Sequence, residues 1–375
     1  MQLNPSRFIK VSALTLTLVA TTALAACGSS SAAVAPVNGK NCHKVGVLLP
    51  ESDTSARWEG KDHPALQAEL SKTFSASNIL ISNANGNDDT QFTQAQADLT
   101  QGACILIVAA HDSSKASQIV QEAKKSNVPV IAYDRLINDP DLSFYVSFDN
   151  VSVGKAQGDY IAANYSRYVS AGHNNIAFIN GSHDDNNAIL FSKGVHGVVD
   201  PLISGGQLKS VFETFTPAWN NDTAQTEMDQ VLTKTSNNIQ IAYVANDGMA
   251  GTVIAALKAQ HLNGKKVLVT GQDATASGIQ QILLGNQNMT IYKPIVKEAA
   301  AAAQLAAALS AGTGTSSIAT ETIANGTAQT PSVLLKVTSV DLSNVATTVI
   351  ADNYVTHAEA CTGVPAGTYG GVTCP

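Results

Sequence analysis

Charged, amide and tryptophan side chains follow apolar runs at several places along the chain. Asp134 and Arg135 follow one run, Asn246 follows another and Lys293 a third. The full set is Arg57, Trp58, Asp134, Arg135, Asp185, Asn187, Trp219, Asn246, Asp273 and Lys293. Asp and Asn oxygens accept hydrogen bonds from hydroxyl groups, Arg, Lys and Asn nitrogens donate them, and a Trp face packs on an apolar C–H surface. Together these residue types suit a polyhydroxylated ligand such as a sugar.

The charges in this set balance. Arg57, Arg135 and Lys293 oppose Asp134, Asp185 and Asp273, which favours a neutral ligand over a sugar acid or a phosphate. Any single position has an ordinary structural explanation, since Asp and Asn cap helices, Arg forms surface ion pairs and Trp fills cores. The same bias repeated after successive apolar runs favours a binding site.

The apolar runs alternate with helix-length segments, and this alternation predicts parallel sheets covered by helices. One series of strands is expected at 45–49, 79–82, 104–109, 130–133 and 144–148, and a second at 176–180, 208–215, 239–245, 266–270 and 289–292, with a last strand at 332–340. So many strands, with a restart near residue 150, favour two doubly wound α/β domains over a (β/α) barrel. In such open sheets ligands bind beyond the carboxyl ends of the strands, where the polar set lies.

The composition excludes several classes of protein. Hydrophobic residues make up 44% of the 375 residues and charged residues 14%, so a wholly disordered chain is excluded. The net charge is −7 with no Lys/Arg-rich block, which argues against a nucleic-acid surface. No zinc-ligand spacing, P-loop, GxSxG or HExxH motif occurs, so no metal, cofactor or catalytic site is expected.

The amino-terminal segment predicts export. Arg7 and Lys10 precede an apolar stretch that ends in Leu24-Ala25-Ala26-Cys27, which resembles the lipobox of a bacterial lipoprotein signal peptide. We expect residues 1–26 to be removed, Cys27 to be lipidated, and residues 27–41 to form a flexible tether. An ordinary signal peptide with an incidental Cys27 is the alternative.

The other four cysteines are Cys42, Cys104, Cys361 and Cys374, for which three pairings exist. Doubly wound sheets of this type usually place the first and third strands side by side. Cys42 precedes the first strand and Cys104 opens the third, so we expect a Cys42–Cys104 disulfide about 5 Å across adjacent strands. Cys361 and Cys374 would then close the Gly-rich tail, 359–375. A free thiol at Cys104 is the alternative.

Several stretches make the chain resemble the periplasmic sugar-binding proteins of ABC importers, in particular those that bind xylose. The matching stretches are ANGNDDTQ (84–91), IAYDRLIND (131–139), FYVSFDNVSVG (144–154), DNNA (185–188), ANDGMAG (245–251), GQDATASGI (271–279) and MTIYKPI (289–295). The resemblance implies that the ten polar and tryptophan positions bind the ligand, with Trp219 as the stacking residue. Ile189 stands where relatives often carry a basic residue, so the individual sugar is left open.

The resemblance also implies two lobes joined by three crossovers, with the ligand held between lobes that close around it. The crossovers are expected near 147–150, 292–294 and 329–332. One lobe would then comprise 42–148 with 294–329, and the other 149–293 with 330–358.

The function that follows is capture of D-xylose or a related aldose by a monomeric, membrane-anchored protein outside the cytoplasm, for delivery to an ABC permease. A sensor that presents bound sugar to a receptor kinase or chemoreceptor is the alternative. A secreted glycosidase, for which paired carboxylates could serve, is the third and least favoured hypothesis.

Overall fold

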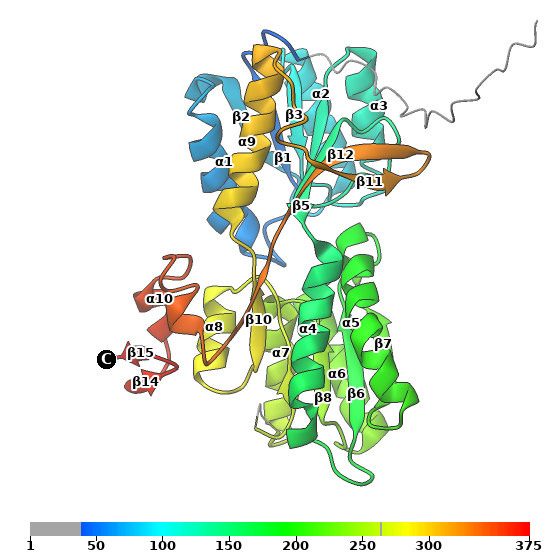
Figure 1. Cartoon of the computed structure of the whole chain (residues 1–375), viewed down its shortest axis with the longest axis vertical. Coiled ribbons are helices and arrows are strands. Elements are labelled where there is room, and N and C mark those ends of the chain that lie inside the picture. Colours follow the sequence, from blue (N-terminus) through cyan, green and yellow to red (C-terminus); the bar gives the residue numbers. More distant parts are fainter. Residues whose placement is uncertain (1–38, 263–264) are drawn as a thin grey trace, which may run out of the picture. The chain divides into compact units, whose positions relative to one another are not determined.

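A computed structural model describes residues 39–262 and 265–375 (Figure 1). The predicted signal peptide, the lipidated Cys27 and all but residues 39–41 of the predicted tether lie outside the described residues. Within the described part, no helix combines the length and the apolar character needed to cross a membrane.

Five strands from the first half of the chain and two from residues 321–335 build a seven-stranded sheet in the order β11-β12-β5-β4-β3-β1-β2. All neighbours are parallel except the β11–β12 hairpin. The strands are β1 (Val45–Leu49), β2 (Ile79–Asn83), β3 (Ile105–Val108), β4 (Val130–Tyr133), β5 (Phe144–Phe148), β11 (Glu321–Asn325) and β12 (Ala328–Leu335). The expected pairing of the first strand with the third is confirmed, and the second strand lies on the other side of the first.

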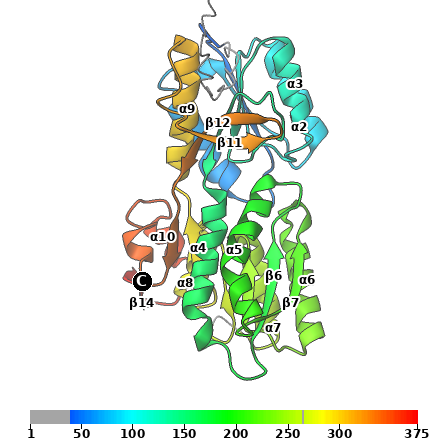
Figure 2. The ribbon, with the colours of Figure 1, turned by 45° about the vertical axis from the view of Figure 1, so that its right-hand side comes forward.

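Helices cover both faces of this sheet, because successive side chains of a strand point to opposite faces. Val47 of β1 joins a core with Leu66 and Leu305, while its neighbour Leu48 joins a second core with Ile119. Figure 1 shows α1 and α9 on one side of the sheet and α2 and α3 on the other, and in Figure 2 α9 again lies on the side away from α2 and α3. The helices are α1 (His63–Leu70), α2 (Asp88–Thr100), α3 (Ser117–Lys125) and α9 (Ile295–Ala311), with the single-turn π-helix η1 (Trp58–Asp62) and the 3₁₀ turn η2 (Ala76–Asn78).

A second, four-stranded parallel sheet has the order β7-β6-β8-β9. Its strands are β6 (Asn175–Asn180), β7 (Lys209–Phe215), β8 (Ile241–Val244) and β9 (Leu268–Val269). The helices around it are α4 (Asn150–Asn164), α5 (Asn186–Ser204), α6 (Asn221–Thr235) and α7 (Asp247–Ala259), with the 3₁₀ turns η3 (Tyr165–Arg167) and η4 (Pro217–Trp219). One apolar core joins the sheet to these helices (Figure 2). Two open sheets exclude the (β/α) barrel.

Beside the second sheet lies a smaller group of elements that carries the end of the chain. β10 (Met289–Tyr292) pairs antiparallel with β13 (Thr338–Asp341), and both pack near α8 (Ala276–Leu283). The remaining elements are η5 (Val345–Thr347), α10 (His357–Cys361) and the hairpin of β14 (Gly367–Tyr369) with β15 (Val372–Cys374).

The chain passes between the two parts three times. It leaves the first sheet after β5 at Phe148, returns between β10 and α9 at 293–294, and leaves again after β12. The third passage differs from the prediction: β12 stays in the first sheet up to Leu335, so the passage lies at 336–337, not at 329–332. The run 332–340 reads as one continuous strand in sequence, and only the change of partner from β5 to β10 divides it.

The structure joins Cys42 to Cys104 and Cys361 to Cys374, as predicted. Their Cα atoms lie 5.5 Å and 5.2 Å apart, respectively. Cys104 directly precedes β3, and Cys42 precedes β1. The first bridge therefore sits at the amino-terminal edge of adjacent parallel strands.

Candidate functional site

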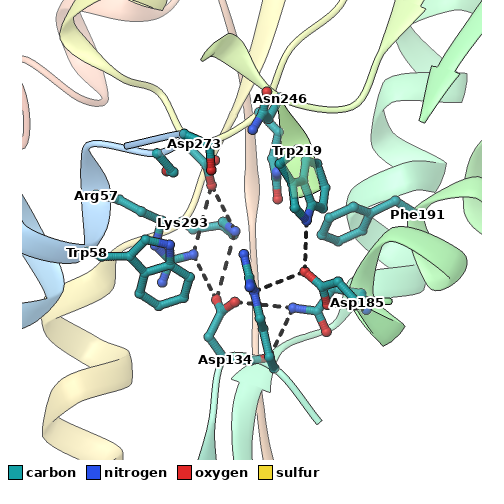
Figure 3. Close-up of a pocket in the computed structure, with 14 residues that line it drawn as sticks. Arg57, Trp58, Asp134, Asp185, Phe191, Trp219, Asn246, Asp273 and Lys293 are labelled. Atoms are coloured by element: carbon teal, nitrogen blue, oxygen red, sulfur yellow. Dashed lines mark hydrogen bonds and ion pairs between the residues drawn. The ribbon is translucent and has the colours of Figure 1, made fainter. Parts of the chain in front are cut away.

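All ten residues singled out in the sequence line one pocket (Figure 3). The first sheet and the loop after β1 supply one side, and the second sheet with β10 supplies the other. The complete lining is Thr54, Ser55, Arg57, Trp58, Asp134, Arg135, Asp185, Asn187, Phe191, Trp219, Asn246, Gln272, Asp273 and Lys293.

Strand ends and helix starts place these side chains. Asp134 and Arg135 directly follow β4, and Lys293 directly follows β10. Asn246 caps α7 by accepting from the Met249 N–H at 2.9 Å, and Asp185 caps α5 by accepting from the Asn187 N–H at 2.9 Å. The pocket thus lies at the carboxyl edge of the sheets, where open α/β folds bind ligands.

Arg57 makes charged contacts in several directions. Its Nη1 donates to Asp134 Oδ2 at 2.8 Å and lies 3.9 Å from Asp273 Oδ1. Its Nε and Nη2 donate to the two oxygens of Asp62 at 2.9 Å and 2.8 Å. Nη2 also lies 3.3 Å from Glu298 Oε2. One guanidinium therefore joins the pocket to two carboxyl groups behind it.

Asp134 lies between the cations of the pocket. Lys293 Nζ is 3.9 Å from Asp134 Oδ2 and 2.8 Å from Asp273 Oδ1. Burial works against ionisation of Asp134, but the charges of Arg57, Lys293 and Arg135 outweigh it and lower the pKa of this carboxyl. Asp134 is thus an ionised acceptor at neutral pH.

An ion pair and a hydrogen bond that share Asp185 connect the two sides of the pocket. Arg135 Nε lies 3.0 Å from Asp185 Oδ2, and the Trp219 indole N–H donates to the same oxygen at 3.2 Å. Burial raises the pKa of Asp185, while Arg135 and the Asn187 and Trp219 N–H groups act in the opposite direction. Hydroxyl groups placed in the pocket can exchange hydrogen bonds with each of these side chains.

Aromatic side chains form the walls. In Figure 3, Trp58 stands on one side and Trp219 with Phe191 on the other, with charged groups between them. The guanidinium carbons of Arg57 and Arg135 lie 4.4 Å and 5.1 Å from the Trp58 ring centroid, a cation–π arrangement. Phe191 meets Trp219 edge to face at 6.3 Å. Both tryptophans of the chain line this pocket.

Three lining residues adopt strained backbone conformations. Asp134, Trp219 and Asp273 have positive φ values of 60°, 56° and 91°, a region that L-residues with side chains rarely adopt. Such strain persists only where the surrounding structure imposes it, and it clusters at functional sites. The turn of Trp219 also needs Gly181, because a Cβ at position 181 would overlap the indole ring.

Sequence reasoning missed four lining residues and two buried carboxyl groups. Phe191 lies one turn after Asn187 on α5, and Gln272 precedes Asp273, so both could have been found by their spacing from predicted residues. Thr54 and Ser55 lie in the loop just before Arg57. The predicted charge balance holds for the lining, but Asp62 and Glu298 add two carboxyl groups behind Arg57.

Residues 45–314 match a family described as periplasmic binding protein domain. That match covers well over half of the chain. The chain belongs to the periplasmic binding protein family.

Relatives of this periplasmic binding protein include sugar-binding proteins. It is 39% identical over 278 residues to the D-xylose-binding periplasmic protein of Haemophilus influenzae, covering 74% of this chain and 81% of the relative. It is 38% identical over 281 residues to the Escherichia coli protein of the same name, covering 75% and 82%. These relatives are named as binding proteins and not as enzymes.

The fold agrees with solved structures of the family. A carbohydrate transporter solute-binding protein from Chloroflexus aurantiacus, in complex with D-glucose, superposes with a TM-score of 0.75 at 26% identity, covering 84% of this chain and 97% of that one. A solute-binding protein of an ABC transporter from Clostridium phytofermentans, with bound β-D-glucose, superposes with a TM-score of 0.74 at 27% identity. This match covers 84% of this chain and 99% of that one. Among the described residues, no group of three or more His, Cys, Asp or Glu side chains is placed so that it could hold a metal ion.

Proposed function

We propose that this protein binds a monosaccharide, D-xylose or a related aldose, in the pocket between its two sheets and delivers it to an ABC permease. The ten predicted residues would hold the sugar, and the parts of the chain on either side of the three passages would act as two closing lobes. The observation that carries the proposal is the convergence of these ten side chains, drawn from both sheets, on one pocket.

The chemistry of the lining supports a neutral sugar. Carboxyl and amide oxygens of Asp134, Asp185 and Asn187 can accept from hydroxyls, and Arg135 and Lys293 can donate to them. The lining has three cations and three carboxyl groups, so it offers no excess positive charge to attract an acid or a phosphate. Trp58 and Trp219 offer flat apolar faces to the C–H side of a pyranose ring.

The relatives support the choice of sugar. The two proteins with 39% and 38% identity are named for binding D-xylose, and the two solved structures hold glucose. Closure would follow from contacts that a sugar makes with both sheets only when they approach each other.

A ligand screen tests the proposal directly. A ligand that binds only the folded state raises its melting temperature, so we expect D-xylose or a related aldose to shift the thermal transition in a panel of pentoses, hexoses and sugar acids. Trp219→Ala and Arg135→Ala should each weaken binding about tenfold or more, because each removes a side chain that lines the pocket and one of the two side-chain donors to buried Asp185 Oδ2.

The matched control is Asp141→Asn, which removes an exposed ion pair with Lys124, and neither of these residues lines the pocket. Calorimetry on this variant should give the wild-type dissociation constant. Absence of any shift across the panel, or full affinity in both pocket variants, would contradict the proposal.

We also infer that Cys27 anchors the mature protein to a membrane from outside the cytoplasm. The support is the Leu24-Ala25-Ala26-Cys27 sequence at the end of the apolar segment. Cys27→Ser should yield protein that is released from membranes or left unprocessed. Membrane fractionation that finds this variant still anchored and processed like the wild type would refute the inference.

A further inference from the structure

Arg57 is held from behind by two carboxyl groups that do not line the pocket. Asp62 accepts from Nε at 2.9 Å and from Nη2 at 2.8 Å, so it grips one edge of the guanidinium with both oxygens. Glu298 Oε2 lies 3.3 Å from the same Nη2. Only Nη1 is left for the pocket, where it donates to Asp134. The orientation of the guanidinium is therefore set by groups outside the lining.

Asp62 is built into this position. It is completely buried, and the Tyr133 hydroxyl donates to its Oδ1 at 2.8 Å. It ends the π-helix η1, which begins directly after Arg57 and is closed by a bond from the His63 N–H to the Trp58 carbonyl. A bidentate Arg–carboxylate pair fixes both angle and distance of the guanidinium, and single π turns recur at functional sites.

Glu298 stands in a different electrostatic position. It lies in the first turn of α9 with no exposed surface, and its Oε1 has no hydrogen-bond partner. The ionised form of such a group is costly, whereas a neutral carboxyl tolerates an unpaired oxygen better.

The charged groups around Glu298 come from three other elements: Arg57 and Asp62 at either end of η1, Asp134 after β4, and Lys293 after β10. Burial raises the pKa of Glu298 well above its usual value, and the negative charges of Asp134 and Asp62 raise it further. The positive charges of Arg57 and Lys293 act in the opposite direction. Burial and the unpaired Oε1 therefore both favour the neutral form of Glu298 over the ionised one.

We propose that Asp62 and Glu298 are positioning residues for sugar binding: Asp62 holds the Arg57 guanidinium with both of its oxygens, and Glu298 fills the space behind Nη2, so that Nη1 stays turned to the pocket. This inference rests on the proposed function, in which Arg57 contacts the sugar. Neither residue touches the ligand in this scheme, and both act through Arg57.

The test compares carboxyl and amide side chains in the full protein. Asp62→Asn should lower the affinity for D-xylose about tenfold or more, because an amide replaces one of the two acceptor oxygens that hold Nε and Nη2 with an NH₂ donor. Glu298→Gln keeps the shape and matches the neutral form that burial favours, so the affinity should change less than about twofold, whereas Glu298→Ala should lower it. Asp98→Asn, another buried carboxyl of the first sheet region outside the pocket, is the matched control and should leave the affinity unchanged.

A double-mutant cycle separates positioning from a general loss of stability. In an Arg57→Lys background, Asp62→Asn should cost little further affinity, because its effect passes through the guanidinium. Additive losses would overturn the proposal, and so would a Glu298→Gln loss as large as that of Asp62→Asn. Tyr133→Phe, which removes one hydroxyl donor to Asp62, should give a smaller loss and serves if Asp62→Asn fails to fold.

Trp58 supplies a readout that needs no sugar. In a Trp219→Phe background it is the sole tryptophan, and the Arg57 guanidinium lies 4.4 Å from its ring centroid. Its emission should shift with Asp62→Asn and stay unchanged with Glu298→Gln and Asp98→Asn. Unchanged emission with Asp62→Asn overturns the positioning role whether or not any sugar binds. Failure of the wild-type protein to bind any sugar of the panel would instead refute the proposed function.

Discussion

Single side chains of the pocket have both a structural role and a place in the lining. Asn246 caps α7 and Asp185 caps α5, which is the ordinary structural role of an Asn or Asp that precedes a helix. Both also line the pocket. The two explanations are compatible, because the cap holds the side chain at the carboxyl edge of the sheet, where a ligand would meet it.

Asp98 on α2 is a buried carboxyl outside the pocket, and it makes stability depend on pH. Its Oδ2 has no hydrogen-bond partner, and burial raises its pKa to about 6. An unfolded Asp titrates near 4, so the folded state binds the proton more tightly. The stability contributed by the neutral form is present below about pH 4 and is lost as the pH rises through about 6.

Asp98→Asn should therefore raise the melting temperature by a few degrees at pH 8 and by much less at pH 4.5. Comparing variant with wild type at each pH removes the contribution of the other titrating groups. Thermal melts at the two pH values measure the difference. An equal difference at both would show that ionisation of Asp98 has no part in it.

At the scale of elements, close contact between β6 and the turn η4 decides where Trp219 stands. Gly181 follows β6 directly, and the indole ring occupies the space that a Cβ at this position would need. Phe191 on α5 closes the ring from another side. The position of one aromatic wall thus depends on three elements and on the absence of one side chain.

Gly181→Ala should displace the Trp219 ring and weaken sugar binding about tenfold or more, since a shifted ring loses both its stacking face and its bond to Asp185. In a Trp58→Phe background the emission of Trp219 should shift as well. Gly251→Ala on α7, where a Cβ meets open space, is the control and should keep the wild-type affinity. Calorimetry with D-xylose measures both, and equal affinities would exclude this role of Gly181.

At the scale of the whole molecule, the Cys42–Cys104 disulfide and the pocket lie at opposite edges of the first sheet. The Cys42–Cys104 bridge joins the amino-terminal ends of β1 and β3, while the pocket lies at the carboxyl ends. The bridge spans a sequence separation of 62. Closing a loop of that length stabilises the folded state by about 4 kcal/mol in the chain-entropy account.

The double variant Cys42→Ser with Cys104→Ser should lose about that much free energy of unfolding, or somewhat less, while its sugar affinity stays within about twofold of wild type. Denaturant titration and calorimetry on the same samples give the two values. A large loss of affinity in protein that is still folded would mean that the bridge shapes the pocket after all.

Local pattern predicted much of the fold and of the lining. Apolar runs alternating with helical segments indicated parallel sheets, and in such sheets polar residues that follow strands gather at one edge. For that reason Asp134, Arg135 and Lys293 could be placed together from sequence, and the order of the first strands led to the Cys42–Cys104 pair. These features depend on residues close to their own strands.

Only the tertiary structure decided the features that depend on distant partners. The run 332–340 carries no local signal of a change of sheet, and its division follows from pairing first with β5 and then with β10. Glu298 reads in sequence as an ordinary charged residue of an Ala-rich helix, yet it is buried against Arg57, 241 positions earlier in the chain. Whether a carboxyl is solvated or buried depends on what packs against it, and here Arg57, just before η1, contacts Glu298 from a distant part of the sequence.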